Sequence, residues 1–176
     1  MKHPSLAILT LAFFVVGCSK EGAPGSSAGA SSSTGSTGSP AGGCSAGAYT
    51  HKNPEFCIQA PEGFTAGSDE VRGGIARVEL TGPQGKAIVL SWVPIDRFDD
   101  ELQGMKALAK PADGDTSLGS GELPGGGFFY HTKFKGETHQ AEVLVKGKTH
   151  ALRCYVNTSQ EMADKLLAAC KTLRGT

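Results

Sequence analysis

Residues 44–176 lack the short motifs on which several enzyme classes depend; Gly-x-Ser-x-Gly occurs at residues 25–29 and 43–47, in and at the border of the Ser/Gly-rich segment. Within residues 44–176, no Gly-x-Ser-x-Gly, Ser-x-x-Lys or His-Glu-x-x-His pattern occurs. These patterns supply the nucleophiles and zinc ligands of serine hydrolases and zinc proteases. Lysines plus arginines equal the acids at 17 each, with no basic stripe, which argues against nucleic acid as a partner. We therefore expect no catalytic residue, no cofactor and no metal site.

No hydrophobic run is long enough to cross a membrane as a helix. The longest, residues 6–16, is interrupted by Thr10 and would extend about 16 Å as a helix, roughly half of the hydrocarbon thickness. It follows a short start that carries the positive charge of Lys2. A positive start and a short apolar run are typical of a secretory signal peptide.

The apolar run ends in Val-Val-Gly before Cys18, which resembles the lipobox of bacterial lipoproteins. The resemblance implies that residues 1–17 are a signal peptide and that Cys18 is acylated after cleavage. Several acyl chains anchor far more firmly than one, so a membrane is the first expected partner. Ser19 implies the outer membrane, by resemblance to sorting in enteric bacteria. The alternative is an ordinary secretory signal with a chance cysteine.

Residues 18–43 form a segment of small and polar residues. Ser, Gly, Ala, Thr and Pro account for nearly all of it, and no large apolar residue occurs after Cys18. Such a segment cannot bury a core, so we expect a lipidated, disordered Ser/Gly-rich tether. Residues 44–176 have the usual length of one domain with a single hydrophobic core.

The domain holds an even number of cysteines, as expected of an exported protein. They are Cys44, Cys57, Cys154 and Cys170. Of the three possible pairings we favour the two between neighbours in sequence, each of which would stabilise the fold by about 3 kcal/mol. Structural zinc is the alternative, but no Cys-x-x-Cys pair occurs and no histidine lies at ligand spacing.

The apolar pattern of residues 44–176 predicts an α+β domain. The expected strands are residues 56–60, 76–81, 87–93, a weak 117–123, and a meander of 128–134, 138–145 and 149–156. Residues 87–93 are apolar on both faces, which favours a central strand. Helical stripes predict one helix from about Asp96 to Ala109 and another from Ser159 to about Leu173. The second helix would fold back on the last strand and bring Cys170 to Cys154.

Two segments resemble the PsbP-like family. They are Phe-Cys-Ile-Gln-Ala-Pro-Glu-Gly-Phe at residues 56–64 and the closing Ala-Cys-Lys-Thr-Leu-Arg at residues 169–174. The resemblance implies an antiparallel sheet sandwiched between two helices over most of residues 50–174. It also implies a non-catalytic accessory or binding module. It carries over no ligand motif and therefore no site residue.

Two short turns, at residues 135–136 and 146–147, set the expected faces of the meander. With two residues in each turn, the face of the C-terminal helix carries Tyr130, Ala141, Val143, Leu152, Cys154 and Val156. The opposite face carries Phe129, His131, Lys133, Leu144, Arg153 and Tyr155. Apart from Lys133, this mixed set suits a partner groove beside the first helix. The alternative is a solvated sheet face with Tyr155 packed under that helix.

Four histidines lie in the domain: His51, His131, His139 and His150. The expected turn at residues 146–147 pairs His139 with Cys154 and places His150 opposite Val143. The two rungs would lie about 13 Å apart, too far for both rings to share a metal ion. We therefore expect the histidines to be ordinary surface or sheet-edge residues.

The functional expectation combines the anchor with the absence of catalytic motifs. We expect a lipid-anchored, non-catalytic binding or scaffold module of the bacterial cell envelope. Its expected partner, beside the membrane, is an envelope protein or a small apolar ligand. The alternatives are an envelope hydrolase with an atypical site and a purely structural lipoprotein whose disulfides resist envelope stress.

Overall fold

The computed structural model describes residues 44–176, so the signal peptide and tether expected from the sequence, with Cys18, lie outside the described residues. The strands are β1 (Tyr49–Lys52), β2 (Glu55–Ile58), β3 (Thr65–Ala66), β4 (Glu70–Arg72), β5 (Ile75–Thr81), β6 (Ala87–Pro94), β7 (Thr116–Leu123), β8 (Gly127–Lys133), β9 (His139–Lys146), β10 (His150–Thr158) and β11 (Arg174–Gly175). The helices are η1 (Pro83–Gly85), η2 (Ile95–Arg97), α1 (Phe98–Leu108) and α2 (Gln160–Cys170).

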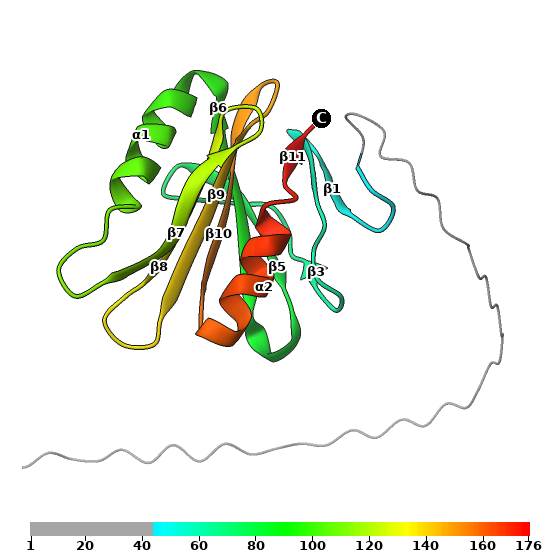
Figure 1. Ribbon diagram of the computed structural model, residues 1–176. Helices are drawn as coiled ribbons and strands as arrows, with labels where there is room; N and C mark the ends of the chain where they lie inside the picture. The colour runs from blue at the N-terminus through cyan, green and yellow to red at the C-terminus, as the bar shows by residue number, and fades with distance from the viewer. Residues whose placement is uncertain (1–43) are drawn as a thin grey trace, which may run out of the picture. The chain divides into compact units, whose positions relative to one another are not determined.

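The main sheet is antiparallel, with the strand order β3-β5-β6-β10-β9-β8-β7, and β4 pairs with β5 beside this path (Figure 1). β6 lies between β5 and β10, as its continuous apolar sequence predicts. One face of β6 is fully covered, since Ile88, Leu90 and Trp92 are buried, whereas Val89 and Ser91 on the other face are only half-buried. The sheet is therefore less completely covered on one side.

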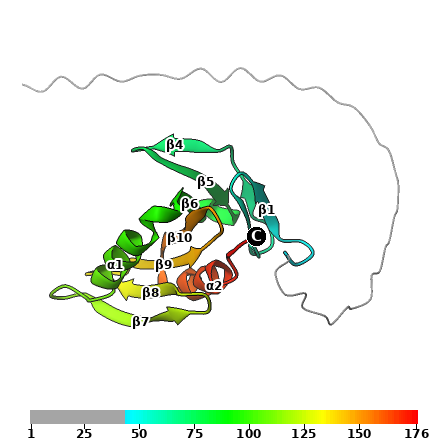
Figure 2. The same cartoon turned by 90° about the horizontal axis from the view of Figure 1, so that it is seen from above.

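The two α-helices pack on opposite faces of the sheet. Leu166 and Cys170 of α2 join the larger core, and Phe98 and Met105 of α1 join a smaller core on the other face. Figure 2 shows the sheet from above, with α1 on one side and α2 and β1 on the other. Both helical stripes predicted from the sequence are confirmed. Within residues 44–176, neither helix is long and apolar enough to span a membrane.

A small second sheet joins the two ends of the domain. Its strand order is β1-β2-β11, and Phe56 and Ile58 of β2 are buried in the larger core. α2 ends at Cys170 and not near Leu173 as predicted, because the last residues turn into β11 and pair with β2.

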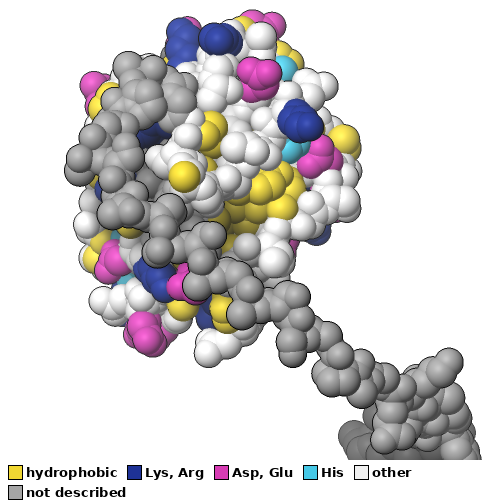
Figure 3. All heavy atoms as spheres, turned by 90° about the vertical axis from the view of Figure 1, so that its right-hand side faces the viewer, with side chains coloured by type: hydrophobic (Ala, Val, Ile, Leu, Met, Phe, Trp, Pro, Cys, Tyr) yellow, Lys and Arg dark blue, Asp and Glu magenta, His cyan; other side chains and the backbone are white. Residues whose placement is uncertain are grey.

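Hydrophobic side chains gather on the side of the domain that faces the viewer in Figure 3.

The β8–β9 pairing corrects the predicted faces of β8. Lys133 pairs with His139, so five residues and not two separate the paired positions. The change of register is odd, and an odd shift moves every side chain of a strand to the opposite face. Phe129 and His131 therefore share the α2 face with Val143 and Ala141, their partners on β9.

The β9–β10 pairing also differs from the prediction, but without moving side chains between faces. Cys154 pairs with Val143, where the two-residue turn had placed it opposite His139. This shift is even, so the alternation of faces along β10 is unchanged. Arg153 and Tyr155 accordingly lie on the face of α1, as predicted.

Candidate functional site

A groove lies on the α1 face of the main sheet, between α1 and the β4–β5 hairpin. α1 packs against β8, β9 and β10, while the β4–β5 hairpin stands out at the other end of the sheet (Figure 2). The space has a volume of about 310 Å³. We call it the arginine groove, and its lining is Arg72, Ile75, Arg77, Val89, Ser91, Glu142, Arg153 and Tyr155.

Three lining residues lie on one rung across neighbouring strands. Arg77 of β5 pairs with Ser91 of β6, and Ser91 pairs with Arg153 of β10. Since strands lie about 4.8 Å apart, the two arginine Cα atoms are separated by about 10 Å. The short side chain of Ser91 leaves the space between the two arginines open.

Arg153 is held on the side of the groove nearer to α1, by one carboxylate of α1 and one of β9. Its Nη1 donates to Glu101 of α1 at 2.8 Å, and its Nη2 donates to Glu142 of β9 at 2.6 Å. Burial alone would lower the pKa of Arg153, but the carboxylates of Glu142 and Glu101 outweigh this effect and raise it. Glu142 is buried, and its second oxygen accepts from Gln140 at 3.2 Å.

Arg77 is fixed to the opposite wall. Glu70 of β4 is its register partner, and the Arg77 Nε donates to a Glu70 carboxylate oxygen at 2.6 Å. Arg72, at the end of β4, is exposed and has no hydrogen-bond or ion-pair partner within residues 44–176. Tyr155 accepts a hydrogen bond from Asn157 at 3.1 Å, so its hydroxyl proton is free to be donated.

The structure brings together only part of the predicted groove. Arg153 and Tyr155 line the arginine groove, and Leu144 lies on the same face but is fully buried with α1. For Phe129 and His131 the prediction was wrong: both lie on the α2 face, and Nζ of Lys171, just after α2, lies 3.5 Å from the centre of the Phe129 ring. The prediction failed for these two because the β8–β9 loop holds five residues in place of two, and an odd difference reverses the faces of β8.

The prediction also missed residues that line the groove from other strands. These residues include Arg77, Val89, Ser91 and Glu142. The alternation of apolar and polar residues along β5 places Arg77 on the face opposite Val78. This pattern points to the groove only when β5, β6 and β10 are known to be neighbours in the sheet. The pairing of distant strands was not visible in the sequence, so these residues could not be assembled into one site.

Two histidines predicted to lie at the surface are buried under α2. His131 Nε2 and His139 Nδ1 are 3.0 Å apart, and the His131 Nδ1 lies 3.6 Å from Asp164 of α2. The His139 Nε2 is buried and has no hydrogen-bond partner among the described residues. His139 pairs with Thr158, next to the start of α2, which is why it is covered. No group of three or more metal-binding side chains is assembled within residues 44–176.

The domain contains the two disulfides that the sequence favoured. Cys44 is bonded to Cys57 and Cys154 to Cys170, with Cα–Cα distances of 5.8 and 5.5 Å. The second holds the end of α2 against β10, in the larger core.

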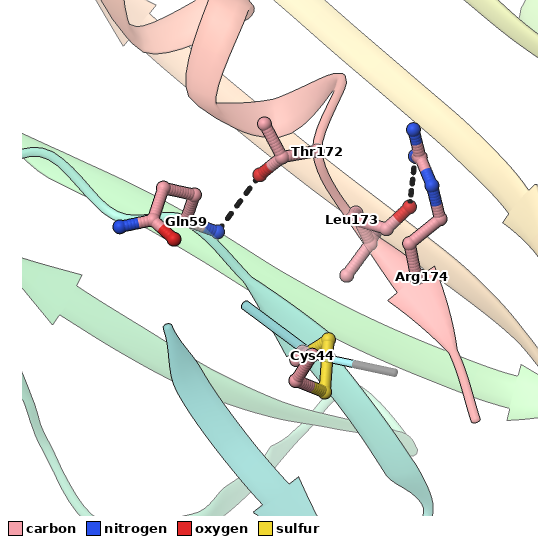
Figure 4. Close-up of a disulfide and its surroundings, with 6 residues drawn as sticks. Cys44, Gln59, Thr172, Leu173 and Arg174 are labelled. Carbon is pink, nitrogen blue, oxygen red and sulfur yellow. Dashed lines mark hydrogen bonds between the residues drawn. A yellow bond between two sulfur atoms is a disulfide. The ribbon is translucent and has the colours of Figure 1, made fainter. Parts of the chain in front are cut away.

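The first disulfide belongs to a junction between the two ends of the domain (Figure 4). The backbone N–H of Gln59, just after β2, donates to the Thr172 hydroxyl at 2.8 Å. Arg174 of β11 pairs with Cys57, and its guanidinium donates to the Leu173 carbonyl at 2.7 Å. The disulfide thus ties Cys44 to β2, and hydrogen bonds join β2 and Gln59 to the C-terminal segment.

Comparison with known proteins shows the fold. No family model matches the chain, and no curated protein matches it. The structure is similar to the solution structure of cyanobacterial PsbP (CyanoP) from Synechocystis sp. PCC 6803, with a TM-score of 0.51 and 12% identity, over 78% of this chain and 100% of that chain. At this identity the similarity concerns the fold alone. The domain therefore has a PsbP-like α+β fold.

Proposed function

We propose that this protein is a lipid-anchored, non-catalytic binding module of the bacterial cell envelope, held at the outer membrane through Cys18. In this proposal the sheet has the PsbP-like position between two helices, and the strands that pack against both helices are β9 and β10. The arginine groove, on the face that α1 leaves uncovered, is the binding face. The observation that carries the proposal is the open rung of Arg77, Ser91 and Arg153.

The groove is better suited to binding than to hydrolysis. A serine nucleophile needs an adjacent base, and no histidine lies among the described residues that line the groove. Glu142 is the one carboxylate of that lining, and Arg153 and Gln140 occupy its oxygens. These contacts hold the lining in place, as a preformed binding site requires. A purely structural lipoprotein has no need for such an open, charged surface.

The test is photo-crosslinking in cells that export the full-length chain. Benzoylphenylalanine replaces Tyr155 in the groove, and a matched variant carries it at Leu118, which is 46% exposed on the outer strand β7. We expect an ultraviolet-dependent adduct from position 155, detected by gel shift or by mass, and none from position 118. Absence of an adduct at 155, or equal adducts at both positions, would contradict the proposal.

A further inference from the structure

The arginine groove offers hydrogen-bond donors and almost no free acceptors. Both oxygens of Glu142 are occupied, one by Gln140 at 3.2 Å and the other by Arg153 at 2.6 Å. Arg77 uses its Nε and Nη2 toward Glu70, which leaves Nη1 without a partner within residues 44–176. The hollow is therefore complementary to a group that accepts hydrogen bonds.

The free donors come from different strands and meet at one hollow. Arg72 brings an exposed guanidinium from β4, Ser91 a hydroxyl from β6, and Tyr155 a hydroxyl from β10. Three guanidinium groups and a single carboxylate line the space. The planar fork of an arginine matches the two oxygens of a carboxylate or phosphate. An oxyanion is thus the group that this lining recognises best.

The remaining walls of the groove are apolar. Ile75 is 39% exposed at the start of β5, and Val89 on β6 is half-buried. Covering them with a branched hydrocarbon group would remove apolar surface from water. A small apolar ligand, one of the two partners expected from the sequence, would instead leave the donors of Arg72, Ser91 and Tyr155 desolvated without partners, and this is unfavourable.

We propose that the arginine groove binds a small molecule in which a carboxylate or phosphate group adjoins a short branched apolar group. This inference rests on the proposed function, because it names the ligand class of the same groove. The oxyanion lies between Arg72, Arg77 and the Ser91 hydroxyl. The apolar group lies on Ile75 and Val89.

The experiment is a titration of the purified full-length chain in detergent micelles, followed by the amide signals of Val89 and Ser91 in proton–nitrogen correlation spectra. The probes are 3-methylbutanoate, isobutyl phosphate and the neutral 3-methylbutanamide. We expect saturable shifts with the two anions and none with the amide. Arg72→Gln, at an exposed residue, should weaken anion binding about tenfold, the loss expected for a charge-assisted hydrogen bond.

Arg97→Gln is the matched control, because Arg97 is exposed on η2 and lies outside the groove lining. We expect its affinity for the anions to stay within about twofold of the wild type. Absence of saturable shifts with both anions, equal affinity for the amide, or unchanged affinity in Arg72→Gln would overturn the inference. If adducts still form at Tyr155 in that case, only the ligand class is wrong. If they do not form, the binding function fails too.

Discussion

His131 and His139 share a hydrogen bond beneath α2, with 3.0 Å between Nε2 of the first ring and Nδ1 of the second. Asp164 faces the other nitrogen of His131 at 3.6 Å and so favours a proton on that nitrogen. Burial lowers the pKa of His131, as do the neighbouring His139 and Lys171, whereas Asp164 opposes them. The neutral form of His131 is therefore favoured in the folded domain.

The first prediction is that acid destabilises the domain through His131. The pKa of His131 is lower in the folded protein than the value of about 6.5 in the unfolded chain. The unfolded chain thus binds more protons as the pH falls through 6.5, and the free energy of unfolding decreases. Urea denaturation at pH 7.5 and 5.5 should show a larger decrease in the wild type than in His131→Gln. His150→Gln is the control and should behave like the wild type. Equal decreases in all three proteins would show that His131 is not the cause.

The second prediction concerns the ion pair in the groove wall. Arg153→Ala should reduce the free energy of unfolding by about 3–5 kcal/mol, because it leaves the buried carboxylate of Glu142 without its partner. Adding Glu142→Gln to this variant should restore part of the loss. Arg97→Ala removes an exposed ion pair with Asp100 and should cost less than about 1 kcal/mol. A loss from Arg153→Ala no larger than from Arg97→Ala, measured by urea denaturation, would show that the pair contributes little.

The third prediction separates the two disulfides. Their sequence separations, 13 and 16 residues, are similar, so the loss of chain restraint on removing either one is about 3 kcal/mol. Cys154 and Cys170 are both fully buried, so replacing this pair by alanine also removes core contacts. Thermal melting should fall further for this double variant than for Cys44→Ala with Cys57→Ala. The reverse order would mean that the junction at the small sheet contributes more than the packing under α2.

The fourth prediction is lipidation at Cys18, which lies outside the described residues. Cells given labelled palmitate should incorporate label into the wild type and not into Cys18→Ser. The wild type should also fractionate with membranes and the variant with soluble proteins, because the acyl chains provide the affinity for lipid. An unlabelled mature protein with Ser19 or a later residue at its N-terminus would instead indicate an ordinary secretory signal.

The sequence predicted the elements better than their register. The stripes of α1 and α2, the central position of β6 and the fold-back of α2 onto Cys154 all follow from local patterns of apolar residues. The face of β8 does not, because it depends on whether the loop after it holds an even or an odd number of residues. Lys135 and Gly136 suggest a tight turn, but Lys133 pairs with His139 across a longer loop. That difference moved Phe129 and His131 out of the predicted groove.

The short elements and the buried polar residues were not visible in the sequence either. β3 and β11 contain two residues each, too few for a periodic pattern, and exist because longer strands offer them an edge. The burial of His131 and His139 results from the start of α2 lying over the β8–β9 hairpin. The residues next to a histidine in the sequence do not show whether a distant helix will bury it. The groove itself required the long-range pairing of β5, β6 and β10.

The central claim is that the arginine groove is the occupied face of the domain in the cell envelope. Hydroxyl-radical footprinting tests it most directly, by comparing oxidation in intact envelopes with oxidation of the purified full-length chain. Tyr155 reports on the groove, and Phe134, 37% exposed after β8, reports on a surface outside it. The account predicts that Tyr155 is protected in envelopes while Phe134 is oxidised equally in both samples. Equal oxidation of Tyr155 in the two samples, or protection confined to Phe134, would contradict it.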